Sequence, residues 1–268
     1  MSTPAQGPAP TCPRHPDRVA YVRCQRCERP ACPECQRPAA VGVLCVDCLK
    51  QAQAQARPVR SRLGFTMSAG PPIATYVLMA LNVGLFLLGP VLIGSAWEGY
   101  LGLWPGYTAE LGATYIDVGN EWYRWITSGF VQFNWIHLGF NMLALFQLGS
   151  VLEPAMGRGR FIALYMGSLI GSSAGVMLLA DSGVHGGASG AIFGLIAAYG
   201  VILKRLNLPV TQVVVIAAIF IGAPLLGFMS GVSWEGHLGG AVTGLVIMLL
   251  MFRSVDKREA AQRAGHTP

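Results

Sequence analysis

A serine and a histidine lie in two separate apolar segments of the chain, and together they have the chemistry of a nucleophile and its base. Ser189 lies in the sequence GASG at 187–190, and His237 lies in the sequence WEGHLGG at 234–240. A serine hydroxyl attacks a carbonyl carbon only when a neighbouring group takes its proton. Because both segments are apolar enough for a lipid bilayer, the pair predicts peptide-bond hydrolysis inside or at the edge of the membrane.

Glycines four residues apart mark both segments, at 186, 190 and 194 and at 236, 240 and 244. Small residues at this spacing line one helix face and allow two membrane helices to approach closely. Either strip alone more often serves only helix packing, with Ser189 as another small residue and His237 as a satisfied polar group. Two strips, each beside one member of the pair, favour a catalytic dyad.

Hydrolysis through a serine also needs donors for the oxyanion of the tetrahedral intermediate. His137 and Asn141 are four residues apart and therefore share a helix face. The Asn141 amide, the His137 ring and the backbone N–H of Ser189 are the candidate donors. A single His or Asn in a membrane helix is as often an inter-helix hydrogen-bonding group, but two at the same outer depth as the dyad favour function.

A carboxylate that would complete a triad is not evident. Glu235 precedes His237 by two residues, which on a helix turns it about 200° away. Asp181 lies at a suitable depth in a loop of unknown course. His185 is a rival base only four residues before Ser189, but the flexible pair at 186–187 makes it poorly suited to hold a ring in place. The prediction is a Ser-His dyad.

These residues resemble the rhomboid family of intramembrane serine proteases. The matching sequences are GASG at 187–190 for the nucleophile, GHLGG at 236–240 for the base and HLGFN at 137–141 for the oxyanion site. YRW at 123–125 is similar to the tryptophan-arginine signature of the first loop, and 149–157 around Glu153 is similar to the glycine-glutamate pattern that closes the second helix. The resemblance covers residues 73–252.

The resemblance implies a six-helix bundle with a water-filled cavity open to the outer face. It also implies cleavage of single-pass membrane proteins near a helix-destabilising stretch, after a small residue. Two positions depart from the family pattern, since Gly236 replaces the usual alanine and Phe193 a frequent tyrosine. We expect Phe193 still to pack against the imidazole, so neither departure indicates an inactive relative.

The composition requires an integral membrane protein, because 53% of the 268 residues are hydrophobic and only 12% are charged, whereas soluble domains carry about 25% charged residues. A membrane-spanning helix needs about 20 residues. Six apolar stretches are expected to span, although the second and sixth are short: 73–93, 137–152, 161–180, 186–203, 210–228 and 233–252.

Basic residues indicate the topology, because cytoplasmic loops are enriched in Lys and Arg. With a cytoplasmic N-terminus, the inner segments hold nearly all of them and the outer segments hold only Arg124. Both termini are therefore predicted in the cytoplasm. The protein is expected to lie in the cell membrane, namely the bacterial plasma membrane. The first outer loop, 94–136, is rich in Trp and Tyr and is expected to lie in the outer leaflet.

All seven cysteines precede the first apolar stretch, and His15 makes them eight potential ligands in four pairs with two-residue gaps. This spacing is typical of closed, structural zinc sites. Two zinc ions are therefore expected, and a disulfide framework is disfavoured in a reducing cytoplasm. The module resembles a B-box or RING cross-brace; sequential pairing fits almost as well. The ligands are Cys12, His15, Cys24, Cys27, Cys32, Cys35, Cys45 and Cys48.

Charge argues against nucleic-acid binding. The chain has a formal net charge of +6, but its basic residues form no single stripe. The module at 12–48 holds six arginines and four acids, so seven thiolates and two zinc ions leave it slightly acidic. A cytoplasmic protein partner is the favoured hypothesis over a purely local folding unit.

The sequence thus predicts an all-α polytopic membrane protein of the rhomboid type behind a small zinc-binding domain. The expected organisation is a disordered N-terminus at 1–11, the zinc domain at 12–48, a linker at 49–70, the protease domain at 71–253 and a cytoplasmic tail at 254–268. The lipid bilayer and single-pass membrane proteins are the expected partners, and no cofactor is expected for catalysis. The alternatives are a non-cleaving binding or escort protein of the same fold, and a transporter, which would typically show inverted repeats.

Overall fold

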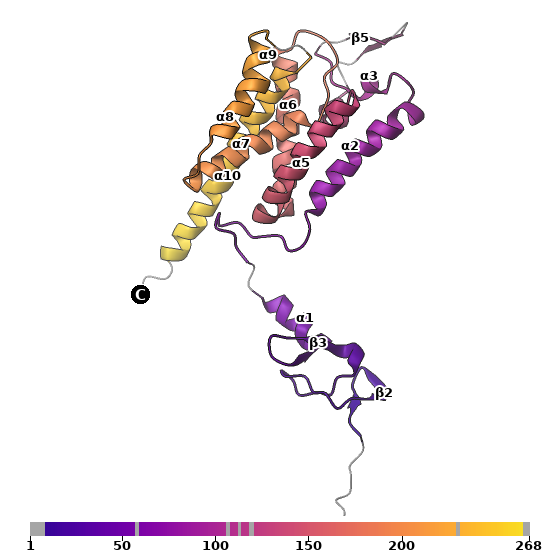
Figure 1. The fold of residues 1–268 in the computed structure, drawn as a ribbon, viewed down its shortest axis with the longest axis vertical. Coiled ribbons are helices and arrows are strands. Elements are labelled where there is room, and N and C mark those ends of the chain that lie inside the picture. Colours follow the sequence, from indigo (N-terminus) through magenta and orange to yellow (C-terminus); the bar gives the residue numbers. More distant parts are fainter. Residues whose placement is uncertain are drawn as a thin grey trace, which may run out of the picture. The chain divides into compact units, whose positions relative to one another are not determined.

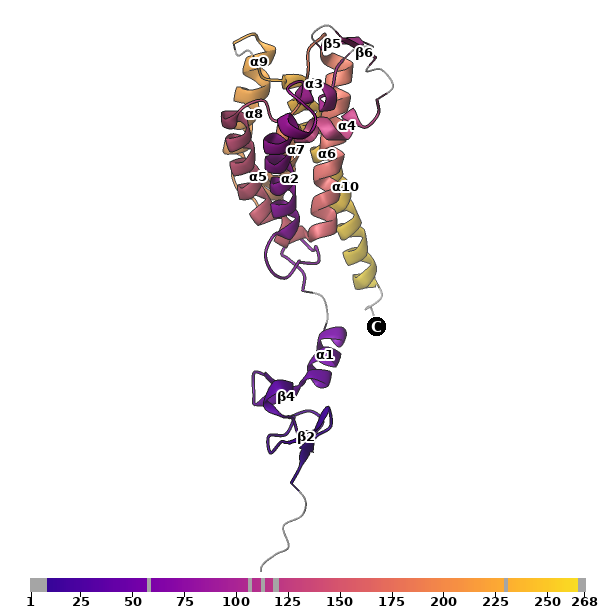
Figure 2. The same cartoon turned by 90° about the vertical axis from the view of Figure 1, so that its right-hand side faces the viewer.

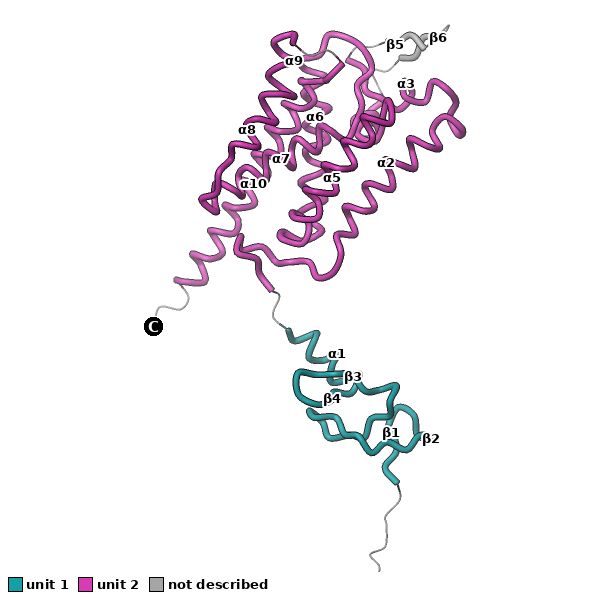
Figure 3. Tube along the Cα trace, viewed as in Figure 1, with its two compact units in different colours: residues 1–58 teal, residues 59–268 magenta. Residues whose placement is uncertain are grey.

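A computed structural model describes residues 9–56, 59–105, 108–111, 114–117, 121–228 and 231–264. Residues 1–8 of the predicted disordered N-terminus, Tyr107 of the aromatic loop and residues 265–268 of the predicted tail lie outside the described residues. The chain divides into two compact units, Met1–Pro58 and Val59–Pro268, which Figure 3 distinguishes by colour.

The first unit is small and built largely around its cysteines. Two antiparallel hairpins, β1 with β2 and β3 with β4, precede one short helix. Among residues 9–56, the buried side chains are those of six cysteines and of two alanines, Ala20 and Ala31. So small an apolar core does not stabilise a fold without disulfides or a structural metal. The elements are β1 (Thr11–Cys12), β2 (His15–Val19), the 3-10 helix η1 (Pro33–Cys35), β3 (Gln36–Pro38), β4 (Val43–Cys45) and α1 (Val46–Gln55).

The second unit is helical, and its apolar segments follow the expected order. Four described helices, α2, α5, α6 and α10, are long and apolar enough to cross a membrane. The other two expected spans correspond to α7, with 17 residues, and to the shorter apolar run Thr211–Leu225. The elements are α2 (Ile73–Leu92), α3 (Trp97–Leu101), β5 (Thr108–Leu111), β6 (Thr114–Asp117), α4 (Arg124–Thr127), the 3-10 helix η2 (Ser128–Phe130), α5 (Trp135–Met156), α6 (Arg158–Leu179), α7 (Ser189–Arg205), α8 (Thr211–Ala217), the π-helix η3 (Ala218–Gly222), α9 (Ala223–Leu225) and α10 (Trp234–Ala264).

Helix boundaries differ from the hydropathy limits in three places. The second span is longer than expected, because Asn134 caps α5 through a hydrogen bond from the His137 N–H to its side chain, so that the helix begins at Trp135. The last span continues as α10 to Ala264, into the predicted tail. Gly186 lies before α7 rather than within it, because Gly187 takes a φ of +126°, which interrupts any helix before Ser189.

Helices α6, α7 and α10 pack against one another, and α2 lies beside α5 (Figures 1 and 2). The glycine strips allow α7 and α10 to approach closely, as expected, at two positions of each strip. A Cβ atom added to Gly240 would overlap the carbonyl oxygen of Gly190, and one added to Gly244 would overlap the backbone of Gly194. Two serines of α6 also pack against the glycines of α7, since Ser172 faces Gly190 and Ser168 faces Gly194. The backbones of α7 and α10 are therefore in contact close to the helix ends that carry Ser189 and His237.

The segment that follows the first unit packs into the second unit instead of crossing open solvent. Leu63 and Phe65 are buried, and the ring of Phe65 stacks on that of Phe252 in α10 with centroids 5.2 Å apart. Gly64 faces Val255 of α10 so closely that a Cβ atom would overlap its side chain. This strap, residues 59–67, stabilises the extension of α10 beyond its apolar part.

A buried carboxylate joins α5 to α2. Glu153 is fully buried and accepts hydrogen bonds from the backbone N–H of Ala74 at 3.0 Å and of Thr75 at 2.8 Å, and from the Thr75 hydroxyl at 2.8 Å. The first turn of α2 has no cap of its own, because Pro72 precedes it. The carboxylate therefore satisfies N–H groups that a helix start leaves without partners.

Replacing Glu153 with alanine is expected to lower the free energy of unfolding by roughly 2–4 kcal/mol, because it strands buried donors. Denaturant titration in detergent measures this change. Glu153→Gln keeps one acceptor oxygen and is expected to lose about half as much. An alanine variant as stable as wild type would show that these bonds contribute nothing to the bundle.

Candidate active site and metal centres

Ser189 and His237 face each other across the contact between α7 and α10. The Ser189 Oγ lies 2.9 Å from Nε2 of His237, a hydrogen-bond distance, although the two residues are 48 positions apart. His237 is only 6% exposed. Both residues lie at the first turn of their helices, so the backbones fix both side chains. The serine hydroxyl thus has a base within reach of its proton.

Two further groups hold the His237 ring. Nδ1 lies 2.9 Å from the carbonyl oxygen of Phe220, and since a carbonyl only accepts, Nδ1 carries the hydrogen. In a neutral ring Nε2 then has a free lone pair directed at Ser189. Phe193 stacks on the imidazole with centroids 4.2 Å apart and planes 14° apart, as expected for this position. The ring is therefore oriented on three sides.

Asn141 lies within a buried chain of side-chain amides. Its Nδ2 donates to Oε1 of Gln132 at 2.8 Å, and Nε2 of Gln132 donates to Oδ1 of Asn82 in α2 at 2.8 Å. All three residues are buried. One amide hydrogen of Asn141 is thus engaged and the other is left for a further acceptor. Sequence reasoning missed Asn82 and Gln132, although Asn82 is a polar residue inside an apolar stretch, which is a signal of function or of hydrogen bonding.

His137 lies close to the serine, on the other side of Gly187. A Cβ atom added to Gly187 would lie 2.9 Å from Nε2 of His137 and 3.5 Å from the Ser189 Oγ. The backbone N–H of Phe133 donates to Nδ1 of His137 at 3.4 Å. The ring therefore presents Nε2 toward the space above Gly187, next to the serine oxygen.

The other titratable candidates make different contacts. Nδ1 of His185 lies 2.9 Å from the hydroxyl of Ser233, not from Ser189, and Nε2 lies 3.2 Å from the carbonyl oxygen of Ser182. Glu235 accepts from Ser233 at 3.2 Å, so its carboxylate does not orient the His237 ring. Nδ1 of His237 is paired with Phe220 rather than with Asp181. Ser189 and His237 line a small pocket of mixed character, whose polar lining residues also include Ser128, Ser172, Ser173, His185 and Ser233.

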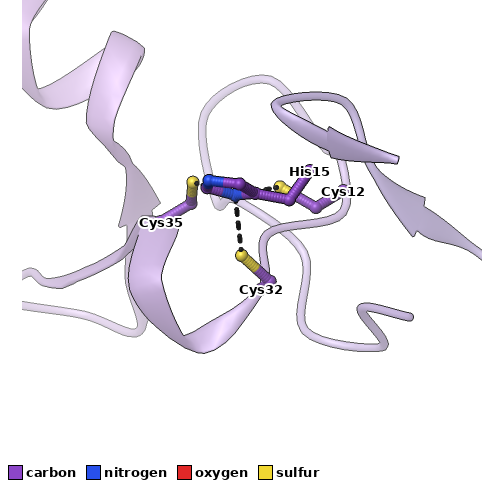
Figure 4. A group of neighbouring side chains, drawn as sticks. All are labelled: Cys12, His15, Cys32 and Cys35. Carbon is purple, nitrogen blue, oxygen red and sulfur yellow. Dashed lines mark hydrogen bonds between the residues drawn. The ribbon is translucent and has the colours of Figure 1, made fainter. Parts of the chain in front are cut away.

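The eight Cys and His residues of the first unit form two groups of four. Cys12, His15, Cys32 and Cys35 make one group, and Cys24, Cys27, Cys45 and Cys48 the other, which is the cross-braced arrangement. Within each group the ligand atoms all lie within 4.8 Å of one another. In the first group Nδ1 of His15 lies 3.2, 3.4 and 3.9 Å from the sulfurs of Cys32, Cys35 and Cys12 (Figure 4). Donors about 2.3 Å from one tetrahedral ion would lie about 3.8 Å apart, so each group could hold a metal ion.

Electrostatics around the first group also suit a cation. A backbone hydrogen bond from Cys32 lowers the pKa of the Cys12 thiol to about 6, whereas burial raises the pKa of Cys35 to about 11. Several thiolates therefore do not form together here without a positive charge. Glu34 lies 3.9 Å from Nε2 of His15, on the side of the ring away from the sulfurs, and Arg18 lowers the pKa of this carboxyl. A carboxylate behind a histidine ligand is a common outer partner of a metal site.

Comparison with known proteins identifies the second unit. The family model described as "Rhomboid domain" matches residues 119–254. A Bacillus subtilis protein named "Rhomboid protease GluP" is 32% identical over 65% of this chain and 34% of its own length. "Rhomboid protease AarA" of Providencia stuartii is 27% identical over 71% of this chain and 76% of its own length. An uncharacterised protein of Mycobacterium tuberculosis is 35% identical over 49% of this chain.

The match to some of these relatives is partial. The chain covers 34% of the length of the Bacillus protein and 60% of that of the mycobacterial protein. The family match begins at 119 and thus leaves the Cys/His unit, Met1–Pro58, outside it.

Proposed function

Since the chain belongs to the rhomboid family and is a membrane protein, we propose that it is an intramembrane serine endopeptidase that cleaves transmembrane segments with a Ser189-His237 dyad. The observation that carries the proposal is the 2.9 Å hydrogen bond between the Ser189 Oγ and Nε2 of His237, made while Nδ1 donates to a carbonyl. Buried in a membrane helix bundle, such a pair has no evident use in packing alone.

The mechanism follows from these contacts. Nε2 of His237 takes the Ser189 proton as Oγ bonds to the scissile carbonyl carbon, and the carbonyl oxygen becomes an oxyanion. The oxyanion is stabilised by the Ser189 backbone N–H, by the remaining amide hydrogen of Asn141 and by His137. The protonated His237 then gives its proton to the leaving nitrogen as the C–N bond breaks. Water, deprotonated by the same ring, hydrolyses the acyl-enzyme and restores Ser189.

The proposed substrates are single-pass membrane proteins in the lipid bilayer, cut near a helix-destabilising stretch. We propose a bacterial plasma membrane location, which the bacterial relatives support. The distribution of basic residues supports a topology with both termini in the cytoplasm. We further propose the boundaries 12–48 for the metal-binding domain and 71–253 for the protease domain. No nucleic acid is proposed as a partner.

Fluorophosphonate labelling of the purified protein tests this function, because the probe reacts only with an activated serine. Wild type is expected to be labelled and to cleave a transmembrane substrate with a helix-destabilised segment. Ser189→Ala is expected to lose both properties, and Ser182→Ala, in the exposed loop before α7, is expected to keep both. No label at Ser189 together with no cleavage would favour the non-cleaving binding protein.

For the first unit we propose two structural zinc ions and a cytoplasmic protein partner. The donor set of seven thiols and one imidazole is typical of zinc. Zinc would supply folding free energy here and take no part in the hydrolysis.

Metal analysis of the full-length protein is expected to find two zinc ions per chain. Their removal with a chelator is expected to make residues 12–48 protease-sensitive, because structural zinc contributes about 10–16 kcal/mol in small finger domains. Fluorophosphonate labelling of Ser189 serves as the control and is expected to persist. Fewer than one metal ion per chain, or unchanged protease resistance, would contradict the proposed sites.

A further inference from the structure

The carbonyl that binds Nδ1 of His237 comes from an irregular part of the fifth apolar segment. Phe220 lies in the π-helix η3, Ala218–Gly222, between α8 and α9. Carbonyl oxygens in a regular α-helix are occupied by the N–H four residues later. A carbonyl that leaves this pattern to accept from a side chain needs a local reason.

Pro224 supplies that reason. It lies four residues after Phe220 and is buried. Proline has no backbone N–H, and its ring also clashes with the carbonyl of the residue four positions earlier. Both effects act on the Phe220 carbonyl, one by leaving it without its helical donor and the other by pushing it away from the regular path. π-helical turns accommodate such displacements.

The displaced carbonyl accepts the hydrogen bond from the histidine ring that a carboxylate accepts in a catalytic triad. It accepts from Nδ1–H of His237 at 2.9 Å, and Nε2 stands 2.9 Å from the Ser189 hydroxyl. A neutral imidazole carries one hydrogen, so a hydrogen held on Nδ1 leaves Nε2 as the acceptor. In the opposite tautomer Nε2 would carry the hydrogen and could not take the serine proton.

We propose that Pro224 is a positioning residue of the dyad: by withholding its N–H it keeps the Phe220 carbonyl available to Nδ1 of His237, which fixes the tautomer in which Nε2 is the base. This inference rests on the proposed role of His237 in proteolysis. It adds that the fifth apolar segment completes the catalytic arrangement through its backbone, since among the described residues no side chain other than Ser189 is hydrogen-bonded to the His237 ring.

Nitrogen-15 NMR of histidine-labelled protein in detergent reads the tautomer directly, and His237→Gln assigns the signal. In wild type, His237 is expected to carry its hydrogen on Nδ1. In Pro224→Ala the new N–H competes for the Phe220 carbonyl, so an Nε2–H population is expected to appear. In the same variant, kcat on a transmembrane substrate is expected to fall on the order of 10- to 100-fold, and KM is expected to stay within about twofold of the wild-type value. This loss is smaller than the loss of about 10⁴-fold that a wrong tautomer causes in a carboxylate triad.

Pro90→Ala is the matched control, because it also removes a proline from an apolar helix, α2. It is expected to leave both the His237 signal and kcat unchanged. Two results overturn the inference: a wild-type His237 with its hydrogen on Nε2, which requires no variant to fold, or a Pro224→Ala variant with wild-type tautomer and kcat. A wild type without Ser189 labelling or cleavage would instead overturn the proposed protease function, whatever the NMR spectrum shows.

Discussion

Replacing His237 with alanine is expected to lower kcat/KM on a transmembrane substrate on the order of 10⁴-fold or more, and adding Ser189→Ala is expected to lower it no further. Residues that act as one catalytic unit are strongly non-additive, because removing either one ends the same pathway. The 2.9 Å hydrogen bond between their side chains is the physical basis for treating them as a unit. Cleavage rates of the two single variants and the double variant in proteoliposomes measure the effect.

His185→Ala is the control for this series. His185 also lies on the pocket beside Ser189, but its ring is hydrogen-bonded to Ser233. Its removal is expected to change kcat/KM by less than about tenfold. If His185→Ala matched the loss of His237→Ala, the assignment of the base would be wrong; if the double variant were far less active than both single variants, the two side chains would act independently.

The candidate catalytic residues could be predicted from the sequence because they are side chains in short motifs. Residue type and spacing indicate Ser189, His237, His137 and Asn141, and the glycine strips predict the close contact between the helices that carry Ser189 and His237. The grouping of the eight Cys and His residues remained open between two pairings, because equal gaps allow both. The structure decides between them, because it places Cys12 and His15 beside Cys32 and Cys35.

Main-chain groups and helix ends could not be predicted in the same way. The acceptor for Nδ1 of His237 is a backbone carbonyl, which every residue has, so composition gives no signal apart from Pro224. The extension of α10 to Ala264 is polar and depends on distant partners. Arg205 of α7 pairs with Asp256, and the strap buries Leu63 and Phe65. Hydropathy alone cannot reveal such contacts.

The close contact between α7 and α10 leads to the second large expected effect. Gly240→Ala is expected to lower kcat/KM on the order of 10²-fold or more, because the added Cβ atom would overlap the carbonyl of Gly190 and backbone cannot rotate away as a side chain can. The two helices must separate to admit a methyl group. Gly240 is one turn from His237, and Gly190 adjoins Ser189, so separation lengthens the Ser-His hydrogen bond directly. Misplacement of reacting groups by about 1 Å can cost about 10²-fold in rate.

Gly84→Ala separates this effect from a general response to losing a glycine. Gly84 lies in α2, and a Cβ atom there would meet nothing within 4 Å. It is expected to retain wild-type kcat/KM and to gain roughly 0.5–1 kcal/mol of stability, since alanine is the better helix former. Labelling rates with a fluorophosphonate, measured alongside cleavage, show whether the Gly240→Ala defect lies at Ser189 itself. A Gly240→Ala variant that labels and cleaves like wild type would mean that the dyad does not depend on backbone contact between the two helices.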